Sequence, residues 1–350
     1  MPRVRPPSDW PQGTVTRLAH RSEVLRGNPW GDPVEREIAV YLPAGYSEAG
    51  APGITLWDLA AFTNAGPGHL NWRNQGENLP ARLDRLIGEG VMPPALVVIP
   101  DCYTSLGGNQ YVNSAGVGRY ADYLVQELVP FVEERFNVLR NRDGRALFGK
   151  SSGGYGALYH AMNYPETWGA AASHAGDVGF DLLFRGVFPT VCGVLTLHGG
   201  DPLTFLEAFW RRNQPAGHDY TTLMILAMAA SYDPDPDNPG RIRLPFDLRT
   251  CEIDAERWRQ WLDYDPLTQL QVARGIEALK SLHALYIDVG RYDQYHIQYG
   301  TRRLIDALEQ QGIPHRYEEF DGTHSAIDWR LDHSLPYLAS ALKNAAGAAI

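Results

Sequence analysis

Short apolar runs alternate with amphipathic segments along most of the chain. Residues 54–57 and 95–99 are apolar runs bounded by glycine or proline, which is typical of strands buried on both faces of a sheet. Residues 34–43 alternate polar and apolar side chains before a turn, and this pattern predicts an early antiparallel strand. Further strands are predicted at residues 145–148 and 168–174.

Apolar residues at helical spacing occupy the segments between these strands. Residues 79–87 and 120–136 have this spacing, and a third helix is predicted to follow residue 151 and to end before Pro165. Near the C-terminus, strands are predicted at 285–289 and 315–320, and helices at 298–311 and from about 326. This alternation predicts an α/β fold with a mostly parallel central sheet and helices on both faces.

The alternation stops between residues 180 and 282. Helical pieces are predicted there at residues 202–212, 221–230 and 255–262. About a hundred residues is far longer than the usual connection between two strands of one sheet. We therefore expect residues 180–282 to form an inserted cap on a core made of residues 1–179 and 283–350.

The composition is that of a folded globular protein, and its charge narrows the choice of partners. Hydrophobic residues make up 44% and charged residues 21% of the 350 residues, which is ordinary. The net charge of −10 opposes binding to phosphate backbones and to anionic membrane surfaces. We expect no nucleic acid and no membrane as partners, whereas the oligomeric state cannot be read from the sequence.

Cofactor and targeting signals are not found. Cys102, Cys192 and Cys251 are widely separated and form no CxxC pair, so neither a zinc site nor a disulfide framework is predicted. No Walker or GxGxxG pattern stands in a suitable context, so we expect no cofactor and no metal. The basic residues near the N-terminus precede no apolar stretch of the kind that a secretory signal has, which favours a cytoplasmic location.

Residues 149–153 read GKSSG and lie between a predicted strand and a predicted helix. This setting is that of a nucleophile elbow, in which glycines flank a serine on a tight turn. Ser151 is therefore the candidate nucleophile, beside helix amides that can stabilise negative charge. Ser152 is an alternative that places Lys150 at the first glycine position, and a glycine-rich packing turn is the non-catalytic interpretation.

The nucleophile needs a base, which in this type of fold comes last in the chain. His324 follows the last predicted strand directly and precedes the final helix. The other histidines of the C-terminal part are expected to pack or to face solvent: His296, His315 and His333. His324 is therefore the candidate base.

The base needs a carboxylate that orients it. Asp293 falls in the loop beyond the strand at 285–289, where its side chain can turn toward His324. Asp288 lies inside that strand, which favours a structural role. Asp293 is our prediction for the acid, while Asp288, Asp321 and Asp177 remain alternatives.

These segments resemble a known family. FGKSSGGYGAL, GRYDQY and DGTHSAIDWR together are similar to the esterase branch of the α/β-hydrolases, which includes esterase D-like, enterochelin esterase-like and mycolyltransferase-type enzymes. The resemblance covers about residues 33–342, and the predicted cap matches least. It implies an α/β-hydrolase fold and acyl transfer from a small-molecule ester to water through Ser151, His324 and Asp293.

The resemblance also implies an oxyanion hole and a cleft. By position, the amides of Leu59 and Ser152 are the expected oxyanion donors, although this chain lacks the glycine that family members carry just before the first of them. The segment from residue 100 to 124 is similar to family segments that border the active-site cleft. Trp57 and Asp58 are predicted to border the cleft. Tyr103, Tyr111 and Tyr155 are candidates for the substrate pocket, and half-buried packing around the cleft is the alternative for each tyrosine.

The sequence thus predicts a metal-independent serine ester hydrolase that works through a covalent acyl-enzyme. An acyltransferase of the same fold and a catalytically silent binding protein are the alternatives. The natural ester and its acyl-chain length cannot be read from the sequence.

Overall fold

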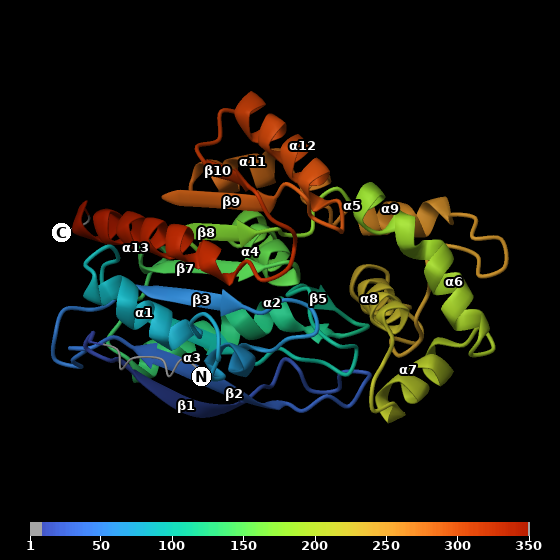
Figure 1. Cartoon of the computed structure of the whole chain (residues 1–350), viewed down its shortest axis with the longest axis horizontal. Helices are drawn as coiled ribbons and strands as arrows, with labels where there is room; N and C mark the ends of the chain where they lie inside the picture. Colours follow the sequence, from blue (N-terminus) through green and yellow to red (C-terminus); the bar gives the residue numbers. More distant parts are fainter. Residues whose placement is uncertain (1–8, 349–350) are drawn as a thin grey trace, which may run out of the picture.

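Eight strands form one sheet within residues 9–348, the part of the chain that the computed structural model describes (Figure 1). The strand order is β1-β2-β4-β3-β7-β8-β9-β10. The bounds of these strands are β1 Thr14–Arg21, β2 Glu35–Leu42, β3 Thr55–Leu59, β4 Leu96–Pro100, β7 Arg145–Lys150, β8 Ala170–His174, β9 Ala284–Gly290 and β10 Arg316–Phe320. Pairing is antiparallel between β1 and β2 and between β2 and β4, and parallel across the rest. The N-terminal residues considered above for a signal lie partly outside the described residues, at 1–8.

Alternation along each strand sends side chains into two separate cores. In β2, Val40 belongs to one core cluster and Tyr41 to the other. Helices α1 (Leu79–Gly88) and α13 (Leu331–Ala348) cover the face that Tyr41 meets. The opposite face is covered by α3 (Val129–Arg135), α4 (Ser152–Asn163) and α12 (Ile297–Gln310). The predicted arrangement, a mostly parallel sheet with helices on both faces, is confirmed.

The helix predicted at residues 120–136 is composite. It runs from α2 (Tyr120–Asp122) through a π-helical stretch (Tyr123–Leu128) into α3. Pro130 stands at the start of α3 and has no N–H, so the regular bond to the residue four positions before it is missing. A wider turn at this point accommodates that loss.

Some elements carry too weak a pattern to be predicted. Strand β1 lies at the sheet edge and most of its side chains are exposed or half-buried, so it shows little apolar alternation. The short hairpin of β5 (Asn113–Ser114) and β6 (Gly118–Arg119) has only two residues in each strand. Hydrophobic patterning therefore detects neither strand β1 nor the hairpin of β5 and β6.

Within the described residues, the segment between β8 and β9 contains seven α-helices, and a stretch without helix separates α8 from α9 at residues 233–254. Its helices are α5 (Phe180–Leu183), α6 (Phe188–Thr196), α7 (Pro202–Arg211), α8 (Gly217–Tyr232), α9 (Ala255–Leu262), α10 (Pro266–Gln269) and α11 (Ala273–Lys280). In Figure 1, α6 to α9 lie together beyond the end of the sheet. By contrast, α10 and α11 pack back against α4 and α12, with Leu270 and Leu279 in the same core cluster as Leu285 of β9. The part that stands apart from the sheet therefore ends near Asp265, before the predicted boundary.

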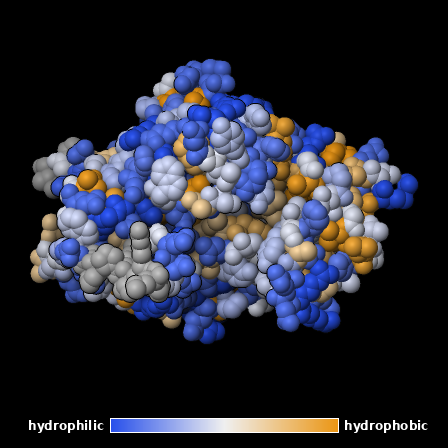
Figure 2. Space-filling model, viewed as in Figure 1, coloured by the Kyte–Doolittle hydropathy of each residue, from blue (hydrophilic) through white to orange (hydrophobic). Residues whose placement is uncertain are grey.

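The surface differs between these two parts. Figure 2 shows a mostly hydrophilic face over the sheet core, while hydrophobic residues are more frequent at the right, where α6 and α9 lie in Figure 1. Leu182 and Leu197 are among the exposed apolar residues of this helical segment. None of the helices in the described part of the chain is both long enough and apolar enough to cross a bilayer.

Candidate active site

A tight turn between β7 and α4 carries Ser151. Its backbone has φ 55° and ψ −123°, a sparsely populated conformation that costs energy for any residue with a side chain. The Ser151 N–H donates to the carbonyl oxygen of His174 at 2.9 Å, and the Ser151 carbonyl oxygen accepts from the Tyr155 N–H at 2.8 Å. These bonds hold the turn, which has the strand–turn–helix form of a nucleophile elbow.

Two glycines allow the turn to form. A Cβ on Gly153 would lie 1.9 Å from the Leu59 carbonyl oxygen, and a Cβ on Gly149 would lie 2.5 Å from the Gly153 carbonyl carbon. Any larger residue at either position would push α4 away from β3 and β7. The glycines that flank Ser151 in the sequence therefore have a packing reason in the structure.

His324 and Asp293 come together from two loops. Asp293 follows β9 and His324 follows β10, and the His324 Nδ1 lies 2.8 Å from the Asp293 Oδ2. A Cβ on Gly290 would lie 2.6 Å from the Gly322 carbonyl oxygen, so this glycine lets the two loops approach each other. The other oxygen of Asp293 accepts from the Tyr295 N–H at 2.8 Å, which fixes the carboxylate.

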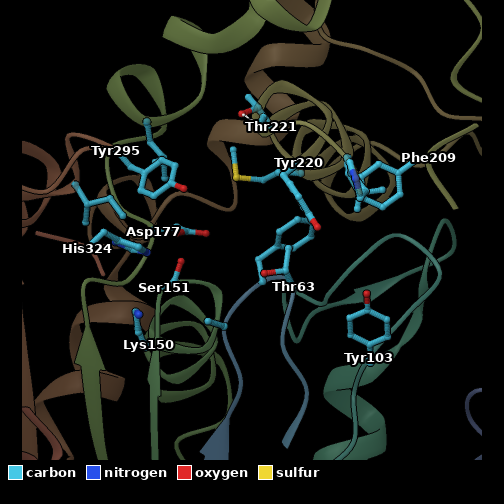
Figure 3. A pocket seen from close by; sticks show the side chains of 18 of the residues that line it. Thr63, Tyr103, Lys150, Ser151, Asp177, Phe209, Tyr220, Thr221, Tyr295 and His324 are labelled. Atoms are coloured by element: carbon cyan, nitrogen blue, oxygen red, sulfur yellow. Dashed lines mark hydrogen bonds between the residues drawn. The ribbon is translucent and has the colours of Figure 1, made fainter. Parts of the chain in front are cut away.

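Ser151 and His324 line one cavity of about 730 Å³. In Figure 3 the Ser151 hydroxyl lies beside the His324 ring, with Asp177 and Tyr295 on one side and Lys150 on the other. The Tyr295 ring packs edge-on against the imidazole, with centroids 4.9 Å apart. The far wall comes from α7, α8 and the segment between them, and includes Phe209, Trp210, Arg212, Tyr220, Thr221 and Met224.

The two candidate oxyanion residues lie on either side of the elbow. Leu59 ends β3 and pairs in register with Gly149, and Ser152 is the first residue of α4. No glycine precedes Leu59, but Asp58 there continues the strand, and this backbone conformation is open to any residue. The Asp58 carboxylate is held by a hydrogen bond with the His69 Nδ1.

A buried polar chain connects the elbow with α8. The Ser152 hydroxyl oxygen accepts a hydrogen bond from the Gln110 Nε2 at 2.6 Å, and the Gln110 Oε1 accepts one from the Tyr232 hydroxyl at 3.1 Å. Tyr232 is the last residue of α8. Sequence reasoning missed Gln110, although it lies in the segment whose family resemblance predicted a border of the cleft.

The two pocket residues predicted on β3 do not line the cavity. Trp57 is 1% exposed and packs edge-on against Trp168, because alternate side chains of β3 point into the core on the α4 side. Asp58 points to the other face and lines a separate cavity of about 180 Å³ with His69. Lys150 borders both cavities, and burial lowers the pKa of its ammonium group.

Of the three predicted pocket tyrosines, only Tyr103 lines the main cavity. Tyr111 is buried, and its hydroxyl donates to the carbonyl oxygen of Ala60 at 2.6 Å, which braces the loop after β3. Tyr155 is also fully buried, on the face of α4 that packs against the helical segment, and its hydroxyl donates to the Tyr264 carbonyl oxygen at 3.1 Å. Aromatic side chains near the elbow thus serve packing at two of the three positions.

The alternative acids have three different surroundings. Asp288 is fully buried in β9, where it bonds His174 and Arg330. Asp321 is exposed and pairs with Arg291. Asp177 is 5% exposed and lines the main cavity, and burial together with the nearby Asp293 carboxylate raises its pKa to about 7.

Comparisons with known proteins identify the family of the chain. The model of the family described as "Putative esterase" matches residues 33–334. Esterase Rv1288 of Mycobacterium tuberculosis is 32% identical over 84 residues, which span 24% of this chain and 18% of that relative. Within the described residues, no group of three or more His, Cys, Asp or Glu side chains is arranged to hold a metal ion.

Solved structures show the same fold. A ferulic acid esterase superposes with a TM-score of 0.60 at 17% identity, covering 94% of this chain and 99% of its own. FphF of Staphylococcus aureus, a fluorophosphonate-binding serine hydrolase, superposes with a TM-score of 0.58 at 16% identity, covering 94% of this chain and 99% of its own. The chain has the α/β-hydrolase fold and belongs to the esterase family whose model spans residues 33–334.

Proposed function

We propose that this protein hydrolyses carboxylic esters through a covalent acyl-enzyme, with Ser151 as nucleophile, His324 as base and Asp293 as the acid that orients it. The family and its serine hydrolase neighbours support ester hydrolysis. The hydrogen bond between His324 and Asp293, at the edge of the cavity that Ser151 also lines, supports the assignment of residues. This arrangement of serine, histidine and aspartate is the one that acyl transfer needs.

In the first half of the reaction, the Ser151 oxygen attacks the ester carbonyl carbon while the His324 Nε2 takes the hydroxyl proton. The tetrahedral intermediate then expels the alcohol, which receives that proton from His324. Asp293 accepts from the Nδ1–H, so that it keeps the Nε2 free for the serine and stabilises the imidazolium. Water repeats these steps on the acyl-enzyme and releases the carboxylic acid.

The negative oxygen of the intermediate needs donors that are already in place. We propose the backbone N–H groups of Leu59 and Ser152 for this role, because both residues flank the elbow and Ser152 begins α4. The positive end of the α4 dipole adds to their effect. The bond from Gln110 to the Ser152 side chain holds this corner of the site.

We further propose that the segment from residue 180 to about 265 is a cap that shapes the substrate pocket. Phe209, Trp210 and Tyr220 of this segment line the same cavity as Ser151. The Trp210 Nε1 donates to the Ser105 carbonyl oxygen at 2.9 Å, which ties α7 to the core. Aromatic side chains at this wall suit an apolar acyl or alcohol group.

Ester hydrolysis by Ser151→Ala and Ser152→Ala tests the proposal. We expect Ser151→Ala to lose at least about a thousandfold in kcat with its fold unchanged, since only oxyanion and binding contributions remain. Ser152→Ala tests the alternative nucleophile. It removes the bond from Gln110 but should keep far more activity than Ser151→Ala, because the proposed role of Ser152 uses its backbone amide. Wild-type turnover by Ser151→Ala would refute the assignment.

A further inference from the structure

Asp177 lies in the main cavity next to the proposed nucleophile, and the mechanism above does not use it. In Figure 3 its side chain is directed into the cavity beside the Ser151 hydroxyl, on the side opposite Lys150. Its side chain reaches the cavity from the turn that follows β8, and the residue is 5% exposed. Whatever binds Asp177 therefore lies close to the reacting ester carbonyl.

The turn that carries Asp177 is closely packed. Ala175 has a φ of 44°, and its N–H donates to the Asp288 carbonyl oxygen at 2.7 Å. A Cβ on Gly176 would lie 2.3 Å from the Ser173 Oγ and 2.8 Å from the Gly154 carbonyl carbon. The chain thus presses this turn against the start of α4 and fixes the direction in which Asp177 points.

The Asp177 carboxyl has no partner of its own. Across residues 9–348, no hydrogen bond or ion pair joins it to another side chain or to the backbone, whereas Asp265, which is also buried, accepts bonds from three backbone N–H groups. A buried carboxylate without a partner is costly, and such groups concentrate where proteins bind substrates. The raised pKa of Asp177 reflects the same cost.

The surroundings of Asp177 favour a cation over a neutral group. The carboxylate of Asp293 lies close enough to raise the pKa of Asp177, so both acids add negative potential here. Of the cations that line the cavity, Arg212 is bonded to Asp219, and Lys150 lies across the Ser151 hydroxyl from Asp177. The aromatic rings of Tyr295 and Phe62 also line the cavity and can face a cation.

We propose that Asp177 is a substrate-binding residue that pairs with a protonated amine, carried by the ester close to its reacting carbonyl. The inference rests on the proposed function and names the substrate class of the same site. A protonated amine would supply both the charge and the hydrogen-bond donor that Asp177 lacks. The amine can belong to the acyl part or to the alcohol part of the ester.

Two pairs of esters of equal shape test this proposal at pH 7. On the acyl side, ethyl alaninate is compared with ethyl 2-methylpropanoate, which has a methyl group in place of the amine. On the alcohol side, 2-(dimethylamino)ethyl butanoate is compared with 3-methylbutyl butanoate. Hydrolysis is followed by acid release with wild type, Asp177→Asn and the control Asp321→Asn, which removes an exposed carboxylate from the loop of His324.

We expect wild type to prefer the amine ester of one pair by at least about tenfold in kcat/KM, as a charge-assisted hydrogen bond allows. Asp177→Asn should bring that ratio to about one while the neutral esters change less than about threefold, and Asp321→Asn should keep the wild-type ratio. The pair that responds identifies the side of the ester.

Three results would overturn the inference: no preference for either amine ester in wild type, the same preference in Asp177→Asn, or an equal loss on all esters in that variant. The last would mean that Asp177 supports the catalytic residues. In each of these cases the proposed function survives if Ser151→Ala is inactive on the neutral esters. Activity in Ser151→Ala would instead refute the proposed function.

Discussion

Two buried histidine–aspartate pairs lie at neighbouring strand ends, and their own geometry is nearly the same. The His324 Nδ1 lies 2.8 Å from the Asp293 Oδ2, and the His174 Nδ1 lies 2.8 Å from the Asp288 Oδ1. The exposed fractions of the two histidines are 8% and 2%. A bond to a carboxylate therefore does not by itself distinguish a catalytic histidine from a structural one.

The two histidines differ in the surroundings of the second ring nitrogen, Nε2. The Nε2 of His174 lies 2.8 Å from the Ser334 hydroxyl oxygen inside the core, so both of its nitrogens are occupied. Asp288 also accepts from the Arg330 Nε at 2.7 Å, which neutralises its charge. His324 instead borders the cavity that Ser151 lines. Access to the cavity of Ser151, and not the pairing with a carboxylate, is therefore what favours His324 as the proposed base.

The largest difference between the pairs should appear when each histidine is replaced. We expect His324→Ala to lose about 10⁴- to 10⁶-fold in kcat, as removal of the base does in serine hydrolases. His174→Asn keeps a donor toward Asp288 and should retain ester hydrolysis within about tenfold for each folded molecule. Steady-state kinetics corrected for the folded fraction would show this, and the reverse order would exchange the two roles.

Replacing Asp293 should mainly lower activity, whereas replacing Asp288 should mainly lower stability. Asp293→Asn is expected to cost about 10⁴-fold in kcat, because the amide favours the wrong tautomer of the base. Asp288→Asn should lower the free energy of unfolding by about 3 kcal/mol, since it removes one of the two carboxylates that pair with the buried Arg330. Urea unfolding and kinetics on both variants provide the test. A stable but inactive Asp288→Asn would contradict the comparison.

Asp177, the unpaired acid of the same site, should have the opposite effect on stability. Its pKa is raised from 3.8 to about 7, so between these values the unfolded chain releases a proton that the native state keeps. The free energy of unfolding should therefore fall as the pH rises through this window. We expect Asp177→Asn to be more stable than wild type by about 2–4 kcal/mol at pH 8, and about equal near pH 4.

The check is urea unfolding of wild type and Asp177→Asn at both pH values. Asp321→Asn serves as the control, because its carboxylate is exposed and should change little. Equal stability of wild type and Asp177→Asn at pH 8 would show that Asp177 is not strained by burial.

The smallest effect is expected in the proposed cap. Trp210 and Trp72 are both partly or largely exposed, but only Trp210 lines the cavity. We expect Trp210→Ala to change the kcat/KM ratio of long to short acyl esters by about three- to tenfold, in keeping with the value of one or two buried methylenes. Trp72→Ala should leave the ratio unchanged. The same shift in both variants would remove α7 from chain-length selection.

The sheet core could be predicted because its signals are local. The apolar run of β4 is fully buried and β7 is buried up to Lys150, and buried parallel strands have a simple pattern. The elbow at Ser151 has its own glycine requirement, which is visible in five residues. Order along the chain was enough to propose Asp293 over Asp288, since the first follows the strand and the second lies inside it.

The pocket lining could not be predicted, because it depends on tertiary packing. Trp57 and Tyr155 lie near the elbow in sequence, yet both point into the core. Helix α6 has apolar residues around much of its surface, and its burial depends on neighbours such as α8 that sequence patterns do not reveal. From the sequence, Asp177 was only an alternative for the acid that orients the base. Its place in the cavity without a hydrogen-bond partner depends on the folded chain and could not be predicted.

Covalent labelling with a fluorophosphonate probe, followed by peptide mass spectrometry, tests the central assignment most directly. The probe reacts only with a serine that a neighbouring base activates. We expect the peptide with Ser151 to be modified in wild type and in His174→Asn, and to remain unmodified in His324→Ala. Modification of Ser152 instead, or labelling that survives in His324→Ala but disappears in His174→Asn, would contradict the assignment.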